Sequence, residues 1–162
     1  MTRGDGTGTR DGATLELAVA AGQHVDCVTA PFDISAGVFI EVSSVTLTSS
    51  DAAYMSVTSA SQILFGLQLN NAQLTVYDNC GFSHGVVVTG PATRWMRFVP
   101  NGANTLAAEG SPDGEHWVGV GSLMDPNIDI TQPFAVDFGA FASTALTGTR
   151  SIHFDNFDVC PP

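Results

Sequence analysis

The sequence predicts an all-β fold, a two-sheet antiparallel β-sandwich of the jelly-roll type. Short apolar runs alternate with polar residues at the two-residue period of a strand. Gly, Pro, Asn and Asp residues, which form turns, separate about a dozen such runs. No stretch keeps the 3.6-residue period of an amphipathic helix, which excludes a parallel βαβ fold.

The first half of the chain predicts a lead-in followed by seven strands. Residues 1–12 are almost entirely Gly, Thr, Arg and Asp, so we expect a flexible lead-in there and a single domain over residues 13–162. Strands are expected at residues 13–19, 25–29, 37–48, 54–58, 63–69, 74–77 and 86–89. A change of phase near residues 43–44 predicts a bulge or bend. The pair Asn70-Asn71 predicts a two-residue hairpin turn, because Asn tolerates positive φ.

Residues 93–122 predict a meander of three antiparallel strands. The segment reads TRWMRFVPNGANTLAAEGSPDGEHWVGVGS, and its strands are expected at residues 93–99, 105–109 and 116–120. Asn101-Gly102 is a strong signal for the first chain reversal. Ser111-Pro112-Asp113-Gly114 fits a type I turn, with Ser first, Pro second and Gly fourth. Two last strands are expected at residues 134–141 and 151–159.

The charge balance excludes several classes of partner. The chain has 16 acidic residues, 5 arginines and no lysine, which gives a net charge of −11. Such a charge repels nucleic acids and anionic membrane surfaces and suits neutral ligands or cations. No window approaches the 18 unbroken apolar residues of a membrane span, so we expect neither nucleic-acid binding nor membrane insertion. The N-terminus lacks the apolar core of a signal peptide.

The three cysteines allow at most one internal disulfide. Cys27, Cys80 and Cys160 form no CxxC pair, so a zinc site built from them is not expected. If a disulfide forms, the expected pair is Cys27–Cys160, because the first and last strands of sandwiches often adjoin. The alternative is three reduced thiols that pack as small apolar groups.

Three motifs together resemble those of a known superfamily. The segments RWMRFV, SPDGEHW and SIHFDNFDV, in this order, are similar to the bacterial laminin-G-like jelly-roll branch of the concanavalin A-like lectin/glucanase superfamily. The resemblance covers residues 32–159. It implies two packed antiparallel sheets, one of them concave, and carbohydrate binding or adhesion as an accessory module of a larger extracellular protein. A glycan or cell-surface polysaccharide is the implied partner, and an extracellular or cell-surface location follows.

The sequence lacks the acid pattern of the superfamily's hydrolases. Those enzymes carry paired acids on one strand, in a Glu-x-Asp-x-x-Glu motif or a close variant, because one carboxyl attacks or activates water and the other protonates the leaving oxygen. No glutamate here lies in such a motif. The nearest pair, Asp155 and Asp158, would point to opposite faces of a regular strand. Neither a Gly-x-Ser-x-Gly nor an HExxH motif occurs, so we expect a non-catalytic protein, with a glycoside hydrolase the least favoured hypothesis.

Aromatic and planar polar side chains are the candidates for sugar binding, because aromatic faces stack on sugar rings and planar groups pair with hydroxyls. The candidate residues are Tyr54, Trp95, Arg97 and Trp117. Trp95 and Arg97 share one face of a regular strand. In the alternative, which the resemblance favours, both tryptophans pack in the core. Arg94 and Arg97 are then exposed and pair with Asp137 or Glu109.

Calcium is the expected metal, if any, because it takes six to eight hard oxygen ligands. Asp125 and Asp129 lie in a loop that offers oxygens at alternate positions, and Asp155 lies where jelly-roll sugar-binding modules often hold a structural ion. In the alternative, Asp125 and Asp129 form turns and Asp155 caps backbone amides. A second functional hypothesis remains beside sugar binding: a structural or assembly domain that acts through protein–protein contacts or self-association.

Overall fold

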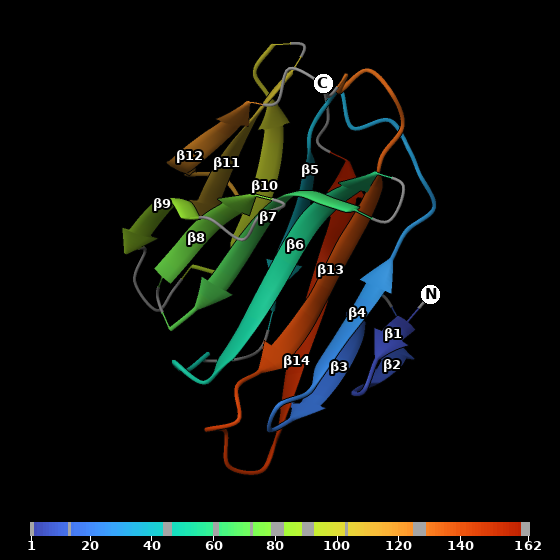
Figure 1. Cartoon of the computed structure of the whole chain (residues 1–162), viewed down its shortest axis with the longest axis vertical. Coiled ribbons are helices and arrows are strands. Elements are labelled where there is room, and N and C mark those ends of the chain that lie inside the picture. The colour runs from blue at the N-terminus through green and yellow to red at the C-terminus, as the bar shows by residue number, and fades with distance from the viewer. Residues whose placement is uncertain are drawn as a thin grey trace.

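Two antiparallel seven-stranded sheets pack face to face in the computed structural model (Figure 1). The structure describes residues 2–12, 14–43, 47–59, 62–71, 73–78, 83–88, 93–102, 104–124 and 129–159. Sheet A has the order β1 (Thr2–Gly4), β4 (His24–Val28), β13 (Ala135–Ala142), β6 (Asp51–Ser59), β7 (Gln62–Asn70), β8 (Gln73–Asp78) and β9 (Ser83–Val88). Sheet B has the order β12 (Val118–Met124), β11 (Thr105–Ser111), β10 (Trp95–Pro100), β5 (Val38–Val42), β14 (Thr149–Val159), β3 (Thr14–Ala20) and β2 (Thr7–Asp11). This arrangement confirms the predicted fold class. Within the described ranges, no helix is long and apolar enough to cross a membrane.

Alternation along each strand builds the core between the sheets. On β10, Met96 and Phe98 are buried, whereas Trp95 and Arg97 on the opposite face are half-buried. The same pattern repeats on both sheets and gathers one apolar cluster. Its fully buried large members include Leu17, Ile34, Ile40, Met55, Leu67, Leu74, Met96, Phe98, Leu106, Ile152 and Phe154. Burying each such side chain stabilises the fold by roughly 1.5–3 kcal/mol.

Residues 2–4 and 7–11, within the expected flexible lead-in, form the strands β1 and β2. The first strand, β1, pairs with β4 at the edge of sheet A, and β2 pairs with β3 at the edge of sheet B. Glycine allows the chain to cross between the sheets: a Cβ at Gly4, which has φ +96°, would lie 2.3 Å from the carbonyl oxygen of His24. Composition misled the prediction because an edge strand is held by its backbone hydrogen bonds and needs few apolar side chains.

The hairpin turn expected at Asn70-Asn71 occurs in the structure, but it begins one residue later. Asn71 has φ +22°, as a hairpin turn of this kind requires. The β7–β8 register pairs Asn70 with Gln73, so Asn70 belongs to the strand and the turn begins at Asn71, one position later than predicted. The bend expected near residues 43–44 lies largely outside the described residues, since β5 ends at Val42 and residues 44–46 are not described.

Candidate functional site

A cluster of aromatic and charged side chains lies on the outer face of sheet B. Trp95 and Arg97 point outward from β10, because their neighbours Met96 and Phe98 point into the core. The register places Phe39 of β5 on one side of Arg97 and Glu109 of β11 on the other. Trp117 follows the turn after β11. We call these five residues, Phe39, Trp95, Arg97, Glu109 and Trp117, the aromatic–arginine cluster.

The guanidinium of Arg97 is held between an acid and an indole. Its Nε donates to the Oε2 of Glu109 at 2.6 Å, and the same oxygen pairs with Nη2. Its Cζ lies 3.9 Å from the centroid of the Trp117 ring, which is a cation–π contact. Of the two acids expected as partners of the arginines, Asp137 and Glu109, it is Glu109 that pairs with Arg97. These two contacts hold the planar guanidinium of Arg97 in one orientation.

The predicted turn at Ser111-Pro112-Asp113-Gly114 presents Trp117 to the cluster. The Ser111 Oγ accepts the N–H groups of Asp113 at 3.2 Å and Gly114 at 2.9 Å. Asp113 Oδ1 in turn accepts the N–H groups of His116 at 2.8 Å and Glu115 at 2.9 Å. These hydrogen bonds, with that of His116 the largest influence, hold the pKa of Asp113 well below its usual range. The segment is thus a closed, hydrogen-bonded loop.

The second carboxylate oxygen of Asp113 meets a histidine. Asp113 Oδ2 lies 2.8 Å from the Nδ1 of His116. This hydrogen bond, and then the charge of Asp113, raise the pKa of the His116 imidazole. Protonated His116 strengthens the pair, so the loop carries a pH-sensitive contact next to the cluster.

Trp95 is held from two sides and borders an open cavity. Its ring lies 5.7 Å from that of Phe39, at an interplanar angle of 49°. Gly114, at φ +78°, approaches so closely that a Cβ there would lie 3.1 Å from Trp95 Cε2. The cavity that Trp95 borders has a volume of about 380 Å³. It is lined by Phe39, Trp95, Arg97, Asp113, Gly114, Glu115 and Trp117.

The structure does not support the alternative in which both tryptophans pack in the core. Trp95 and Trp117 are half-buried on the outer face, where aromatic surface, a fixed cation and carboxylates meet at one cavity. Such a set can stack on an apolar ring face and exchange hydrogen bonds with neighbouring hydroxyls. The sequence prediction missed Phe39. Its alternation with buried Val38 and Ile40 signals an outward side chain, but the register that sets it beside Arg97 cannot be read from sequence.

Tyr54 lies on the other side of the sandwich, on the outer face of sheet A. Its hydroxyl rests on Gly139, where a Cβ would lie 2.6 Å away. Burial, and then the charges of Asp137 and Asp26, raise the pKa of Tyr54 well above its ordinary value. Tyr77 rests in the same way on Gly66. The structure therefore brings Trp95, Arg97 and Trp117 together and leaves Tyr54 in a separate group.

The described residues do not assemble the expected calcium site. Asp129 Oδ1 accepts the Thr131 N–H at 3.0 Å and the Thr131 hydroxyl at 2.6 Å, as in a turn. Asp155 accepts the Thr14 hydroxyl at 3.3 Å and the Asn156 N–H at 2.8 Å. Asp125 lies outside the described residues. Over the described part of the chain, no three His, Cys, Asp or Glu side chains are grouped as metal ligands.

Two further expectations concern the last strand and the cysteines. The β14–β5 register shifts between Asp155 and Asp158, with Asn156 at φ +47°, so the strand there is bulged rather than regular. The argument that placed the two acids on opposite faces assumed a regular strand and fails here. Cys27 is partly buried, while Cys80 and Cys160 lie outside the described residues, and the Cys27–Cys160 disulfide stays a prediction.

Lectins of known structure share this fold. The exoplasmic/lumenal domain of VIP36, in a form bound to Ca²⁺ and Man3GlcNAc, matches with a TM-score of 0.59 at 9% identity, over 94% of this chain and 81% of its own. A Lotus tetragonolobus seed lectin matches with a TM-score of 0.59 at 13% identity, over 100% and 94%. The lectin from Bauhinia forficata in complex with GalNAc gives 0.51 at 13% identity, over 94% and 88%.

The sequence itself matches no protein-family profile and no curated protein. At identities this low, the structural likeness establishes the fold alone. The chain has the concanavalin A-like lectin fold, as the sequence motifs suggested.

Proposed function

We propose that this chain is a non-catalytic carbohydrate-binding or adhesion module of an extracellular or surface protein, and that it binds glycan at the aromatic–arginine cluster. One observation carries the proposal. The Arg97 guanidinium is held 3.9 Å above Trp117 and pairs with Glu109, beside the half-buried Trp95. The lectin fold of the chain, and neighbours of that fold bound to Man3GlcNAc and GalNAc, support the same class of ligand.

The cluster matches the chemistry of a pyranose. One face of a sugar ring is apolar and stacks on an indole, while its edge carries neighbouring hydroxyls that both donate and accept. Arg97 supplies donors, and Glu109, Asp113 and Glu115 supply acceptors at or beside the cavity. The net charge of −11 repels a polyanion at many points along its length, so the proposed ligand of the cluster is a neutral glycan or a neutral stretch of a cell-surface polysaccharide.

A glycan array, followed by calorimetry with the best neutral binder, tests this proposal. We expect Trp117→Ala and Arg97→Gln each to weaken binding roughly tenfold or more, because each removes one of the oriented contacts. Tyr54→Phe is the matched control, since it alters an aromatic residue on the opposite sheet. Wild-type protein that binds no glycan, or the three variants binding equally well, would refute the assignment of the cluster.

Two finer points belong to the same proposal. The motifs RWMRFV, SPDGEHW and SIHFDNFDV support membership of the bacterial laminin-G-like branch. Calcium, with Asp125, Asp129 or Asp155 among its ligands, would stabilise loops rather than contact sugar; Asp129 and Asp155 are not grouped with a third such side chain in the described part of the chain. The measurement is thermal unfolding with and without EDTA: a lower melting temperature in EDTA supports the ion, and an unchanged one removes it.

A second candidate function is supported by the edge of sheet B. Strand β12 ends that sheet and exposes Val118 (51%) and Met124 (75%). An apolar edge strand without lysine offers both backbone and side-chain contacts to another chain. The candidate is a structural or assembly domain that self-associates through β12. Light scattering after size-exclusion chromatography tests it: a dimer that Val118→Lys dissociates would favour assembly, and a monomer would exclude it.

A further inference from the structure

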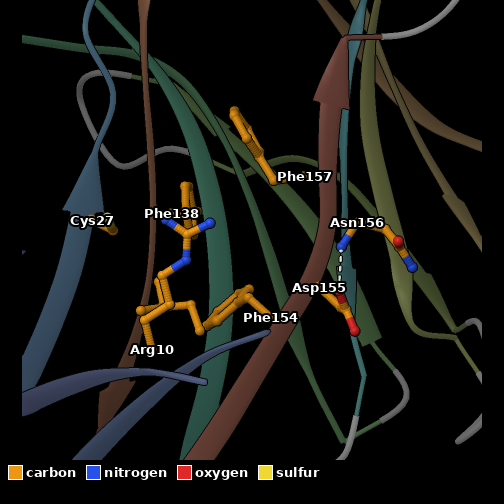
Figure 2. A pocket seen from close by; sticks show the side chains of 8 residues that line it. Arg10, Cys27, Phe138, Phe154, Asp155, Asn156 and Phe157 are labelled. Atoms are coloured by element: carbon orange, nitrogen blue, oxygen red, sulfur yellow. Dashed lines mark hydrogen bonds between the residues drawn. The ribbon is translucent and has the colours of Figure 1, made fainter. Parts of the chain in front are cut away.

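A second cavity, of about 400 Å³, opens at one end of the interior between the two sheets (Figure 2). Leu15, Cys27, Phe138, Phe154 and Phe157 line it, and Arg10 borders it. Phe138 and Cys27 come from sheet A, whereas Leu15, Phe154 and Arg10 come from sheet B. Its volume falls within the range of small-molecule sites, roughly 300–1,000 Å³.

Three phenylalanines form one continuous wall. Phe138 stacks on Phe157 with ring centroids 5.1 Å apart and contacts Phe154 at 5.6 Å. In an unbroken strand, Phe154 and Phe157 would face opposite sides. The bulge after Asp155, with Asn156 at φ +47°, turns Phe157 back toward the interior. The strained residue thus adds a third ring to a cavity that those rings do not fill.

The two charged side chains at the border of the cavity, Asp155 and Arg10, differ in their hydrogen bonding. Both oxygens of Asp155 accept hydrogen bonds, from the Thr14 hydroxyl at 3.3 Å and the Asn156 N–H at 2.8 Å. Arg10 uses only its Nε, which donates to the Gly12 carbonyl at 3.0 Å. Arg10 is solvent-exposed, and within the described ranges its two terminal nitrogens make no hydrogen bond to the protein; in the view of Figure 2 the guanidinium overlaps Phe138.

We propose that this cavity binds a small amphipathic monocarboxylate, with its apolar body against Phe138, Phe154 and Phe157 and its carboxylate on Arg10. An apolar chain gains by leaving water for the aromatic wall. A carboxylate gains charge-assisted hydrogen bonds from the two terminal nitrogens of a guanidinium, whose fork matches its geometry. The site is distinct from the aromatic–arginine cluster and does not depend on glycan binding.

Calorimetry with octanoate and the full chain tests the charge part of the proposal. We expect octanoate to bind, and Arg10→Gln to weaken it roughly tenfold or more, because a hydrogen bond to a charged group is lost. Arg94→Gln, which removes an exposed arginine outside the cavity, is the matched control and should bind as wild type. 1-Octanol should bind wild type and Arg10→Gln equally. No octanoate binding, or equal losses in the two arginine variants, would overturn the proposal.

Cys27 gives a second readout at the apolar wall. In a Cys80→Ser/Cys160→Ser background, it is the one remaining thiol of the chain. Saturating octanoate should slow its alkylation by a small maleimide severalfold, because the occupied cavity shields the thiol. Adding Arg10→Gln at the same octanoate concentration should bring the rate part of the way back to that without octanoate, because fewer sites are then occupied. An alkylation rate that octanoate leaves unchanged would contradict binding at this wall, whatever calorimetry shows.

Discussion

The two outer faces of the sandwich carry aromatic and acidic side chains in the same alternating pattern, yet one face is closed and the other is open. On sheet A, Ser56 is 0% exposed and Asp26 is 7% exposed, although both point away from the core. On sheet B, Trp95, Arg97 and Trp117 border a cavity of about 380 Å³. The same residue classes therefore produce a sealed surface on one sheet and a candidate site on the other.

The cross-strand neighbours account for the difference. Gly139 lies next to Tyr54 and Gly66 next to Tyr77 in the sheet A register, so each ring can lie over a strand that has no Cβ there. On sheet B, the neighbours of Trp95 are Glu41 and Ser111, which carry side chains. A ring flanked in this way cannot lie flat on the adjacent strand. Missing side chains, rather than the aromatic residues themselves, decide which face closes.

The largest expected effect contrasts an aromatic residue of the core, Phe98, with one of the aromatic–arginine cluster, Trp117. Phe98→Ala should cost about 3–5 kcal/mol of unfolding free energy, because Phe98 is fully buried in the core. Trp117→Ala should cost only about 1 kcal/mol, because the half-buried indole leaves little cavity. Urea unfolding measures both. A Trp117→Ala cost equal to that of Phe98→Ala would return this tryptophan to a core role.

The glycines of sheet A give the next largest effect. A Cβ at Gly66 would lie 2.0 Å from Tyr77 Cζ, so Gly66→Ala must lift the ring and should cost about 1–3 kcal/mol. Gly119→Ala on β12 is the control, because a Cβ there meets no atom within 4 Å, and it should stay within about 0.5 kcal/mol. In a Tyr77→Ala background, Gly66→Ala should cost much less unfolding free energy than in the wild type, because the added Cβ no longer meets the ring. Equal costs at the two glycines would contradict a closed face.

Alkaline titration should separate the native from the unfolded tyrosines. Burial raises the pKa of both Tyr54 and Tyr77, the two tyrosines of the chain. The native protein keeps both tyrosines protonated, so their full contribution to the free energy of unfolding is present below the unfolded pKa of about 10. As the pH rises above that value, the free energy of unfolding falls by up to about 1.4 kcal/mol per pH unit for each tyrosine. Absorbance at 295 nm should show no ionisation of the native protein at pH 10. Native ionisation near pH 10 would show that the face is open.

The smallest expected effect concerns the Asp113–His116 pair in the loop beside the aromatic–arginine cluster. Asp113 raises the pKa of His116, and Asp113→Asn should return that pKa toward its ordinary value. The lowered pKa of Asp113 means that its contribution to the loop is present above the ordinary aspartate pKa and is lost as pH falls through the folded value. Histidine NMR titration measures the first shift, with His116→Gln assigning the signal. An unchanged His116 pKa in Asp113→Asn would contradict the contact.

The strands and one turn could be predicted from the sequence, because they depend on the local pattern of residues. Alternation identified the strands, and Ser111-Pro112-Asp113-Gly114 identified the turn that presents Trp117, because both are properties of neighbouring residues. Register and the edge strands were not predictable. The position of Phe39 beside Arg97 depends on pairing between strands far apart in sequence. The pairing of β1 and β2 depends on backbone groups that every residue carries.

The location of Tyr54 was missed for a related reason. Its side chain is aromatic and polar like those of the cluster, and nothing in its own sequence neighbourhood states which sheet its strand joins. Only the β6–β13 pairing places it beside Gly139, across the sandwich from Trp95. Side-chain type therefore indicated candidates for sugar binding, whereas topology decided which of them lie together.

Tryptophan emission during glycan titration tests the central claim most directly, because both tryptophans of the chain, Trp95 and Trp117, lie in the cluster. We predict that a neutral glycan which binds by calorimetry will shift the emission and reduce quenching by acrylamide, with the same midpoint as the calorimetric curve. A glycan that binds by calorimetry yet leaves both emission and quenching unchanged would place binding elsewhere and contradict the account.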